Sequence, residues 1–427
     1  MIRKQKSFGV FVTILGALLL SPTALRAQEA TATETPVVKL AIELGAPFRD
    51  DAVLQREMKL PVWGWSKPET KVTVEFSGQK KSATAGKDGK WMLDLDPLKA
   101  SFEPATMTLT ESSGKSVTLK NILVGEVWFA SGQSNMQWPA SKCDVGLLQK
   151  QIASRMMTRK SKEGSSPRPR RFNVSTSNSL DSRFASVWED ADGFAAALGQ
   201  RIAAKTGQPV GIVLMQSASG KDSKDAELKH WIAGEGLNRA PSLMADFEQL
   251  ESVRPGTKQY EAEVGRYLNA WKKYWGEYIP ALMTTKTVPD GLGWGTYPKL
   301  GAAVTESAQV YNVMVSPFTP SSFKGIIFLA GKSMVEADQG ALFGEQMAAL
   351  ANSWKAKFAC EDPQFFYTIP SSKLAPKITQ PKAIEGRNFA VEINHWPITK
   401  PDPKNPAPAE DNAMLALIEK VMSEVYK

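Results

Sequence analysis

Residues 124–136 read VGEVWFASGQSNM, an apolar run that stops at a small polar turn. A β-branched and aromatic run of this kind is typical of a buried strand, and α/β proteins keep their sites at the ends of such strands. The turn presents one hydroxyl, that of Ser134, just beyond the strand. Ser134 is therefore a candidate nucleophile, although a lone serine in a polar loop more often has no chemical role.

The polar turn differs from the G-x-S-x-G elbow of α/β-hydrolases, because Met136 replaces the closing glycine and Asn135 follows the serine. Residues 125–139, GEVWFASGQSNMQWP, instead match almost every position of V-G-[DE]-V-W-x-x-S-G-Q-S-N-M-x-W-P. This signature opens the sialate O-acetylesterase family, a branch of the SGNH hydrolases. The chain resembles that family, whose fold and activity become expectations for it.

The resemblance implies serine-dependent hydrolysis of acetyl esters, with an acetylated sugar or glycan as substrate and neither a metal nor an organic cofactor. Such chemistry needs a nucleophile, a base, a group that orients the base, and donors for the oxyanion. Ser134 supplies the nucleophile and one backbone donor, and Gln133 and Asn135 are oxyanion or substrate-binding candidates beside it.

The second block of the family reads P-I-G-L-I-Q-S-S-W-G-G-T, and residues 209–220, PVGIVLMQSASG, align with it. Gly220 thereby takes the role of a second backbone donor to the oxyanion, because a glycine lets a carbonyl approach the main chain closely. A glycine needed only for turn geometry explains Gly220 equally well.

The third block of the family is altered in this chain. The segment Y-N-x-M-x-x-P is present at residues 311–317, but the family continuation K-G-x-x-W-Y-Q-G-E-S-N is KGIIFLAGKSM at residues 324–334. Ala330, Lys332 and Met334 thus replace the family's glutamine, glutamate and asparagine. The strand pattern is retained, whereas side chains that would bind the oxyanion and the sugar are lost.

The last block, D-[IL]-H-P-x-N-K, aligns with residues 400–406, KPDPKNP. Lys400 and Asp402 then stand where the family has the acid and the histidine of its triad. These changes support a second class of function. In it, the chain is a catalytically inactive relative of the family that binds glycan or a protein partner through the same cleft. A purely structural envelope protein is a third alternative.

Two histidines, His230 and His395, are the only imidazoles in the chain. His395 follows the strand-like residues 389–393 and is the candidate base, with Glu392 three residues before it as the candidate acid. A structural histidine at a strand end is the alternative. His230, beside Trp231, fits the rim of the site or a packed position.

The first 27 residues resemble an export signal. Arg3, Lys4 and Lys6 precede an apolar core at residues 8–20 and a small-residue exit at residues 24–27. Because that core is short for a bilayer span, we expect a periplasmic or secreted protein without stable membrane insertion after cleavage. A retained anchor is the alternative. Residues 28–37 are Ala/Thr/Glu-rich without an apolar period, which predicts a disordered lead-in.

Composition and residue spacing argue against a nucleic-acid site and a metal site. The chain has 427 residues, 42% hydrophobic content and a formal net charge of +8. Many basic residues lie in residues 155–171 without interleaved aromatics, so we expect a solvated loop and no nucleic-acid partner. Two histidines cannot give a metal-ligand spacing. Cys143 and Cys360 are far apart in the sequence, which leaves a disulfide between them open.

Short strands separated by turn signals fill residues 38–122 and predict a β-sandwich-like N-terminal domain. The expected strands are residues 61–65, 71–76, 91–95 and 107–110. The family's N-terminal motifs F-x-[DN]-x-x-V-L-Q-R and P-V-W-G-W match residues 48–56 and 61–65. Trp63 and Trp65 could stack on sugar, but core or interdomain packing is the favoured interpretation.

Residues 123–427 alternate strands with helices, which predicts an α/β domain with a parallel sheet flanked by helices. By resemblance, this is an SGNH-hydrolase-like esterase domain. The expected strands are residues 209–216 and 323–330, and the expected helices are residues 194–205, 341–358 and 414–426. Residues 242–283 predict a helical insertion, either a cap near the site or helical decoration.

Overall fold

The computed structural model describes residues 42–133, 136, 170–173, 188–215, 227–286, 307–396 and 413–427. They belong to one compact unit, Val38–Lys427, which is separate from the unit Met1–Val37. The predicted export signal and lead-in, Cys143 and most of the basic run lie outside the described residues. Within the described ranges, no helix is both long enough and apolar enough to cross a membrane.

The N-terminal part is built from short strands. They are β1 (Glu43–Leu44), β2 (Val53–Gln55), β3 (Leu60–Trp65), β4 (Lys71–Phe76), β5 (Gln79–Thr84), β6 (Lys90–Leu95) and β7 (Ser101–Glu111). β1, β3 and β6 form a three-stranded antiparallel sheet. β5, β4 and β7 pair antiparallel and lead to β8 (Ser116–Gly132), to which β2 runs parallel. The strands expected in this part are confirmed within β3, β4, β6 and β7.

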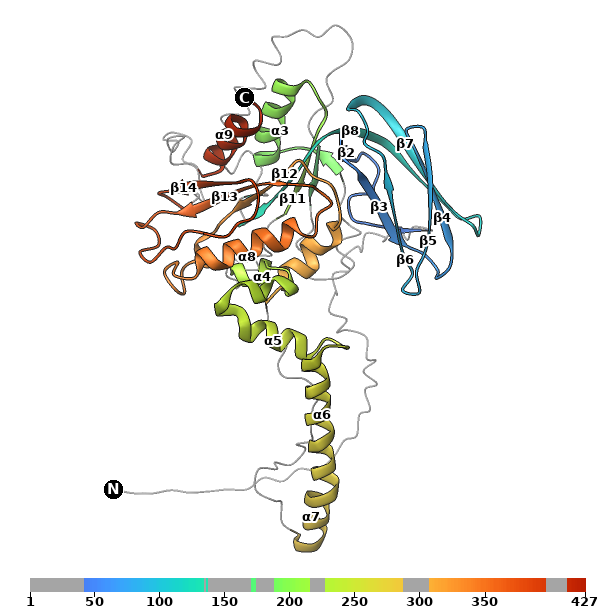
Figure 1. Cartoon of the computed structure of the whole chain (residues 1–427). Helices are drawn as coiled ribbons and strands as arrows, with labels where there is room; N and C mark the ends of the chain where they lie inside the picture. Colours follow the sequence, from blue (N-terminus) through green and yellow to red (C-terminus); the bar gives the residue numbers. More distant parts are fainter. Residues whose placement is uncertain are drawn as a thin grey trace, which may run out of the picture. The chain divides into compact units, whose positions relative to one another are not determined.

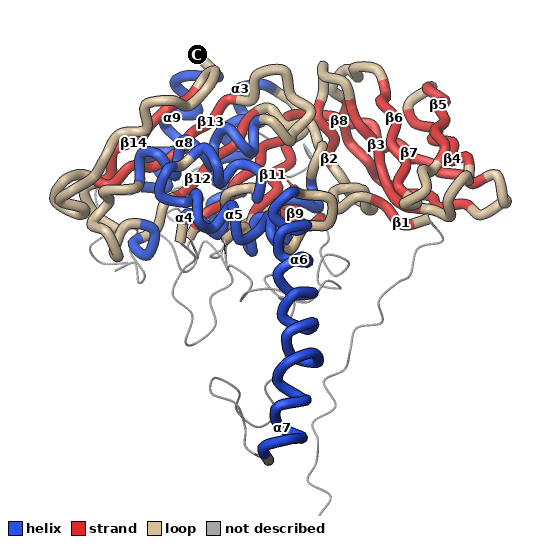
Figure 2. Tube along the Cα trace, turned by 60° about the horizontal axis from the view of Figure 1, so that its bottom comes forward, coloured by secondary structure: helices blue, strands red, loops and turns tan. Residues whose placement is uncertain are grey.

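Strand β8 belongs to two environments (Figure 2). Its burial alternates from Ser116 to Lys120 and is continuous from Ile122 to Gly132, as expected when first one face and then both faces of a sheet are covered. Its first part pairs antiparallel with β7, and its last part is parallel to its neighbours. A separate β-sandwich is not confirmed, because the expected boundary at residues 122/123 falls inside this continuous strand.

The α/β part continues the same sheet, which has eleven strands among the described residues. Its further strands are β9 (Arg170–Asn173), β10 (Trp188–Asp190), β11 (Val210–Leu214), β12 (Gly325–Leu329), β13 (Gln364–Pro370) and β14 (Asn388–Ile393). The order is β10-β9-β11-β8-β12-β13-β14, and only the β9–β10 pairing of this series is antiparallel. The parallel α/β sheet expected from the sequence is therefore confirmed in this coarse form.

Helices cover both faces of this sheet (Figure 1). On one face, α3 (Gly193–Thr206) and α9 (Ala413–Val425) bury apolar residues with Trp128 and Ala130 of β8. On the other face, α4 (Leu228–Trp231) and α8 (Phe343–Lys355) pack with Phe129. The predicted helices 194–205, 341–358 and 414–426 correspond to α3, α8 and α9 and are confirmed.

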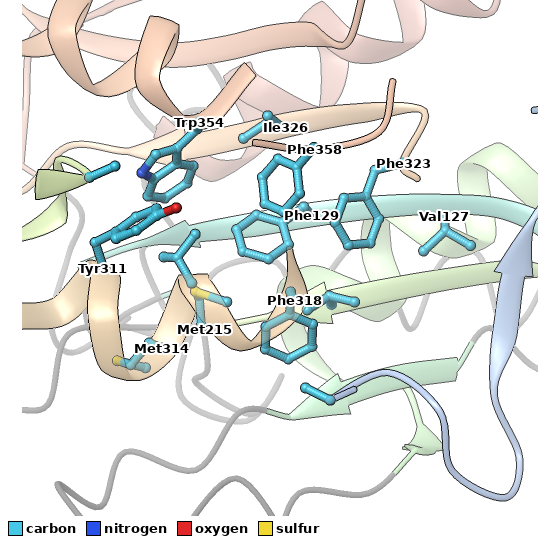
Figure 3. Packing of buried hydrophobic residues seen from close by; sticks show 14 of the residues in the cluster. Val127, Phe129, Met215, Tyr311, Met314, Phe318, Phe323, Ile326, Trp354 and Phe358 are labelled. Atoms are coloured by element: carbon cyan, nitrogen blue, oxygen red, sulfur yellow. The ribbon is translucent and has the colours of Figure 1, made fainter. Parts of the chain in front are cut away.

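Phe129 lies at the centre of an aromatic cluster on the α8 face (Figure 3). Its ring centroid lies 5.1 Å from that of Phe358, 5.2 Å from Phe323, 5.7 Å from Trp354 and 5.9 Å from Phe318. Offset and edge-on aromatic contacts stabilise packing beyond the burial of area alone. The cluster therefore holds β8 firmly just before its functional turn.

The N-terminal motif at residues 48–56 forms hydrogen bonds with the strand segment at residues 124–136. The Gln55 side chain accepts a hydrogen bond from Val127 N at 2.8 Å, and Arg56 Nε donates to Glu126 Oε1 at 2.8 Å. Tyr426, at the C-terminal end of the chain, donates to Glu126 Oε2 at 3.4 Å. The buried Glu126 carboxylate thus connects β8 with both the N-terminal strands and the last helix.

The predicted insertion is helical (Figure 2). It contains η4 (Pro241–Leu243), α5 (Met244–Ser252), α6 (Lys258–Lys273), the π-helical turn η5 (Tyr274–Tyr278) and α7 (Ile279–Thr285), preceded by η3 (Gly234–Arg239). α5 contacts η3 and α6. Neither α6 nor α7 has a buried apolar side chain. A role as a cap stays a prediction.

Candidate functional site

The carboxyl end of β8 is the switch point of the parallel sheet. The chain leaves β8 for β9 and β11 on one side, and later continues with β12, β13 and β14 on the other. A crevice for ligands forms at such a point in open α/β sheets. Ser134 follows β8 by two residues. Ser134, Asn135, Gly220, Lys400 and Asp402 themselves lie outside the described residues.

Gly132 sets the turn that ends β8. Its φ is +136°, and a Cβ at this position would lie 2.1 Å from the carbonyl oxygen of Leu329 in β12. Gln133 N donates to the same oxygen at 3.1 Å, and Met136 N donates to Gln133 O at 3.1 Å. Only glycine allows the two strand ends to approach this closely. Gln133, just before Ser134, is thereby bonded to the end of β12, and Met136 is bonded back to Gln133.

Gln133 is buried, with 6% of its surface exposed. It lies against Gly331, where an added Cβ would come within 3.0 Å of both Cβ and Oε1 of Gln133. The Nε2 donor of Gln133 has no hydrogen-bond partner among the described residues. The glycine after β12 thus makes room for an amide whose donor is unused.

Three serine hydroxyls at neighbouring strand ends are likewise buried without a hydrogen-bond partner among the described residues. Ser131 is the next-to-last residue of β8, Ser333 follows β12 and Ser371 follows β13, and each Oγ is buried without a partner in the described structure. An unsatisfied buried polar group costs about 1–3 kcal/mol, and native proteins keep such groups mainly where water, an ion or a ligand binds. Sequence reasoning missed these serines, because burial of a hydroxyl depends on packing and leaves no local pattern.

The altered third block has structural roles after β12. Ala330 N donates to Thr368 Oγ1 at 2.8 Å, and Gly331 N donates to Met334 Sδ at 3.3 Å within the turn η8 (Lys332–Met334). The Lys332 side chain is 64% exposed and lies 3.5 Å from Glu336. These residues shape the strand end, but none of them presents a buried charge there.

The retained segment 311–317 lies on the α8 face. Tyr311 and Met314, in the π-helical turn η6 (Tyr311–Val315), are buried close to Met215, which follows β11 (Figure 3). Burial, and to a lesser extent the charge of Glu235, raises the pKa of Tyr311 far above its usual range. Its phenol therefore stays protonated at neutral pH and is not a base.

His395 and Glu392 are both exposed at the carboxyl end of the edge strand β14. Because β12 and β13 lie between β8 and β14, the two strands are about 14 Å apart at the usual spacing of the sheet. His395 would have to reach back across two strand ends to meet the turn after β8. The structure places it after the carboxyl end of β14, and its catalytic role stays a prediction.

His230 is half-buried in α4, where its backbone N donates to Glu227 O at 3.0 Å. Its neighbour Trp231 is fully buried, and the Trp231 carbonyl accepts a hydrogen bond from Trp354 Nε1 at 2.8 Å. A packed helix therefore fixes the backbone of His230.

The two candidate sugar-stacking tryptophans pack in the N-terminal part. Trp63 is 1% exposed and meets Phe48 edge-on at 5.0 Å, and Trp65 is partly buried against the same core. The packing interpretation is confirmed.

Cys360 carries a free thiol, and burial raises its pKa to about 11. Among the described residues, no group of three or more His, Cys, Asp or Glu side chains could hold a metal ion.

Comparisons with known proteins agree with the motif assignment. The chain is 37% identical over 99 residues to human sialate O-acetylesterase and 35% identical over 94 residues to the rat protein. The human match covers 21% of this chain and 19% of the relative, so the chain matches about a fifth of that protein's length. No protein-family model matches the chain.

A solved structure supports the fold over a longer range. The crystal structure of a carbohydrate acetylesterase from Xanthomonas citri superposes with a TM-score of 0.54 at 20% identity, covering 89% of this chain and 74% of that one. At this identity the similarity concerns the fold alone. The mixed α/β architecture with a large central sheet is consistent with an esterase fold.

Proposed function

We propose, since the chain is sialate O-acetylesterase-like, that it is an exported carbohydrate O-acetylesterase with Ser134 as its nucleophile. The observation that supports this proposal is that β8 ends at the switch point of the sheet, and Ser134 follows that strand by two residues in the sequence. The polypeptide on both sides of Ser134 is bonded to the end of β12 or to the turn itself.

The proposed fold is of the SGNH type. In the order β10-β9-β11-β8-β12-β13-β14, the strand that precedes the proposed nucleophile is the middle one, and the candidate base follows the last one in the sequence. The N-terminal strands would then act as a β-sandwich-like module that shares β8 with the esterase sheet. The ion pair of Arg56 with Glu126 supports this shared arrangement, because it ties the two parts together.

The proposed reaction has two steps. Ser134 Oγ attacks the acetyl carbonyl while His395 accepts its proton, and the backbone amides of Ser134 and Gly220 hold the oxyanion. His395 then gives this proton to the sugar oxygen, so that the sugar leaves with a free hydroxyl group and the acetyl group stays on Ser134. Water, deprotonated by His395, then attacks the acetyl carbonyl; the bond to Ser134 Oγ breaks, acetate leaves, and His395 returns the proton to Oγ. Glu392 would orient His395, and the mechanism needs neither a metal nor an organic cofactor.

The export part of the proposal rests on the N-terminal residues. The basic start, apolar core and small-residue exit of residues 1–27 support a cleaved signal and a periplasmic or secreted enzyme. Acetylated glycans outside the cytoplasm would then be its substrates.

A second candidate function is supported by the third block. Ala330 and Met334 only shape the backbone, and Lys332 points to solvent. A protein that retained the fold and binding surface but lost turnover would bind acetylated glycan or a protein partner without hydrolysing it.

Acetate release from an acetylated sugar, measured for the wild type and Ser134→Ala, separates the two candidates. For the esterase we expect a loss on the order of 10³-fold or more in kcat. His395→Ala should lose activity comparably, whereas His230→Ala should keep it. Equal rates for the wild type and Ser134→Ala would reject the esterase, and glycan binding without turnover would then favour the second candidate.

A further inference from the structure

The helices α6 and α7, joined by the π-helical turn η5, form an arm that extends away from the sheet and its covering helices (Figures 1 and 2). The main contacts of the arm among the described elements are those of α6 with α5. At 1.5 Å per residue the arm is about 40 Å long, so its end lies far from its base at α5. We call residues 267–286 its outer half.

One face of the outer half is aromatic. The ring of Trp271 stacks on that of Trp275 at a centroid distance of 6.3 Å, and it meets Tyr274 edge-on at 5.5 Å. Tyr267 meets Trp271 edge-on at 6.2 Å. These side chains are three or four residues apart in the sequence, the spacing that places residues on one side of a helix. Tyr278, four residues after Tyr274, continues the same face.

Apolar side chains of the arm are open to solvent. Trp275 is 62% exposed, Leu268 is 59% exposed and Met283 is 70% exposed. No apolar side chain of α6, η5 or α7 is buried. Exposed apolar groups that lie together mark surfaces that bind a partner or a membrane.

Basic side chains accompany the aromatic face. Lys272, Lys273 and Lys286 are exposed, and the sequence of the outer half contains one acidic residue, Glu277. Three lysines against one glutamate give the outer half a formal charge of +2. Lys273 Nζ lies 5.3 Å from the centroid of the Tyr278 ring, so a cation adjoins the aromatic face directly.

This combination of side chains favours an anionic lipid surface as the partner. Tryptophan and tyrosine rings prefer the membrane–water interface, and lysines are attracted to anionic headgroups there. A second copy of the chain would instead bring two arms of like charge together, and coiled-coil seams are built mainly from aliphatic side chains.

We propose that the outer half of the arm is a docking surface for a bilayer that contains anionic lipids. Leu268, Trp275 and Met283 enter the boundary between headgroups and acyl chains, while Lys272 and Lys273 contact lipid phosphates. The arm lies in the interface without spanning the bilayer and holds the body of the protein beside the membrane. This surface is independent of the proposed esterase activity.

Sedimentation with lipid vesicles tests the proposal. Residues 28–427 are used, because the apolar residues 8–20 could bind lipid themselves and the compact unit is Val38–Lys427. Vesicles of equal parts phosphatidylglycerol and phosphatidylcholine should pellet the protein, and about 0.5 M sodium chloride should weaken the binding by screening the lysines.

Trp275→Ser tests the apolar part of the surface. The partition coefficient of the protein onto the mixed vesicles should fall at least about tenfold, because the ring no longer leaves water. Phe102→Ser is the matched control, since it removes another exposed aromatic ring, from β7 in the N-terminal part, and should bind like the wild type.

Lys272→Gln/Lys273→Gln tests the electrostatic part. Its partition coefficient onto the mixed vesicles should fall about tenfold or more, whereas weak binding to pure phosphatidylcholine vesicles should stay unchanged. Lys115→Gln/Lys120→Gln removes the same charge from exposed positions in the N-terminal part and should change neither value.

A wild type that stays in the supernatant with the mixed vesicles, or a Trp275→Ser variant that pellets equally well, would overturn the proposal. A wild-type mass twice that of Trp275→Ser in light scattering, without vesicle binding, would assign the face to a second copy and overturn it too. Pelleting with insoluble polysaccharide but not with vesicles, lost in Trp275→Ser, would overturn it in favour of a glycan partner.

Docking and catalysis are tested separately. Ser134→Ala should bind the vesicles like the wild type, and Trp275→Ser should hydrolyse a soluble acetyl ester at the wild-type rate. Circular dichroism and thermal unfolding of Trp275→Ser control for loss of the helical arm, and Met283→Ser at the end of the arm provides a second variant with the same expected direction.

Discussion

At the scale of single residues, the conformation of the site depends on Gly132. Its positive φ and its contact with the Leu329 carbonyl leave no space for a side chain. Gly132→Ala should therefore separate the ends of β8 and β12 and abolish ester hydrolysis. Gly114, whose φ is +89° with nothing within 4 Å of an added Cβ, is the matched control.

Gly114→Ala should cost only the backbone strain of about 1–3 kcal/mol and keep its activity. Activity and urea unfolding of both variants check the expectation. A Gly132→Ala protein as active as Gly114→Ala would show that the close approach of the two strands does not position the nucleophile.

Phe129 packs β8 against four aromatic rings on the α8 face. Phe129→Ala should lower the free energy of unfolding by about 3–5 kcal/mol, because it opens a cavity between four aromatic rings. Phe102→Ala, at a position 37% exposed, should change it by no more than about 0.5 kcal/mol. Chemical denaturation compares them, and similar losses would contradict the assigned cluster.

At the scale of elements, β8 joins the two parts of the chain through Glu126 and Arg56. The Glu126 side chain is 1% exposed, so Arg56→Met leaves a buried carboxylate without its cation and should cost about 3–5 kcal/mol. Arg56→Met/Glu126→Leu removes both charges and should be less destabilised than the sum of the single variants. Additive losses in this double-mutant cycle would show that the pair does not couple the two parts.

Glu111, at the end of β7, predicts a pH dependence of stability. Burial alone would raise its pKa, but hydrogen bonds from Ser66 and Ser113, with nearby lysines, hold the pKa below its usual range. Its contribution is therefore complete above the unfolded pKa of about 4.3 and is lost as the pH falls through the lower, folded pKa.

Urea unfolding at pH 7, 5 and 3 should show a stability difference between the wild type and Glu111→Gln that shrinks at the lowest pH. The exposed Glu103, changed to Gln, should show no such difference. A difference that grew on acidification would contradict the direction of the pKa shift.

Elements with a clear burial period were predictable from the sequence. β4 has the bounds expected for residues 71–76, because Val72, Val74 and Phe76 alternate with exposed residues. β5 was missed, since its Lys-rich stretch has no apolar period and is a strand only because it pairs with β4. β13 was missed although its residues are all buried and Asp362-Pro363 precede it as a turn signal, because a short apolar run without alternation does not distinguish a strand from a buried helix segment.

At the scale of the whole molecule, the sequence could not indicate that one sheet runs through both parts. That property depends on the pairing of β8 with β7, β11 and β12, which are far apart in the chain. The edge that carries the site was predictable, because an apolar strand ending at Ser134 has only one functional end in a parallel sheet. The other groups at that edge required the three-dimensional structure.

The central claim is that Ser134 is a nucleophile that takes an acyl group from a sugar. Its most direct test is covalent trapping of the full chain with a fluorophosphonate, followed by peptide mass spectrometry. We expect one adduct, on the peptide that contains Ser134, with labelling slowed by an excess of acetylated sugar and absent in Ser134→Ala. An unlabelled wild type, or an adduct on another residue that persists in Ser134→Ala, would contradict the claim.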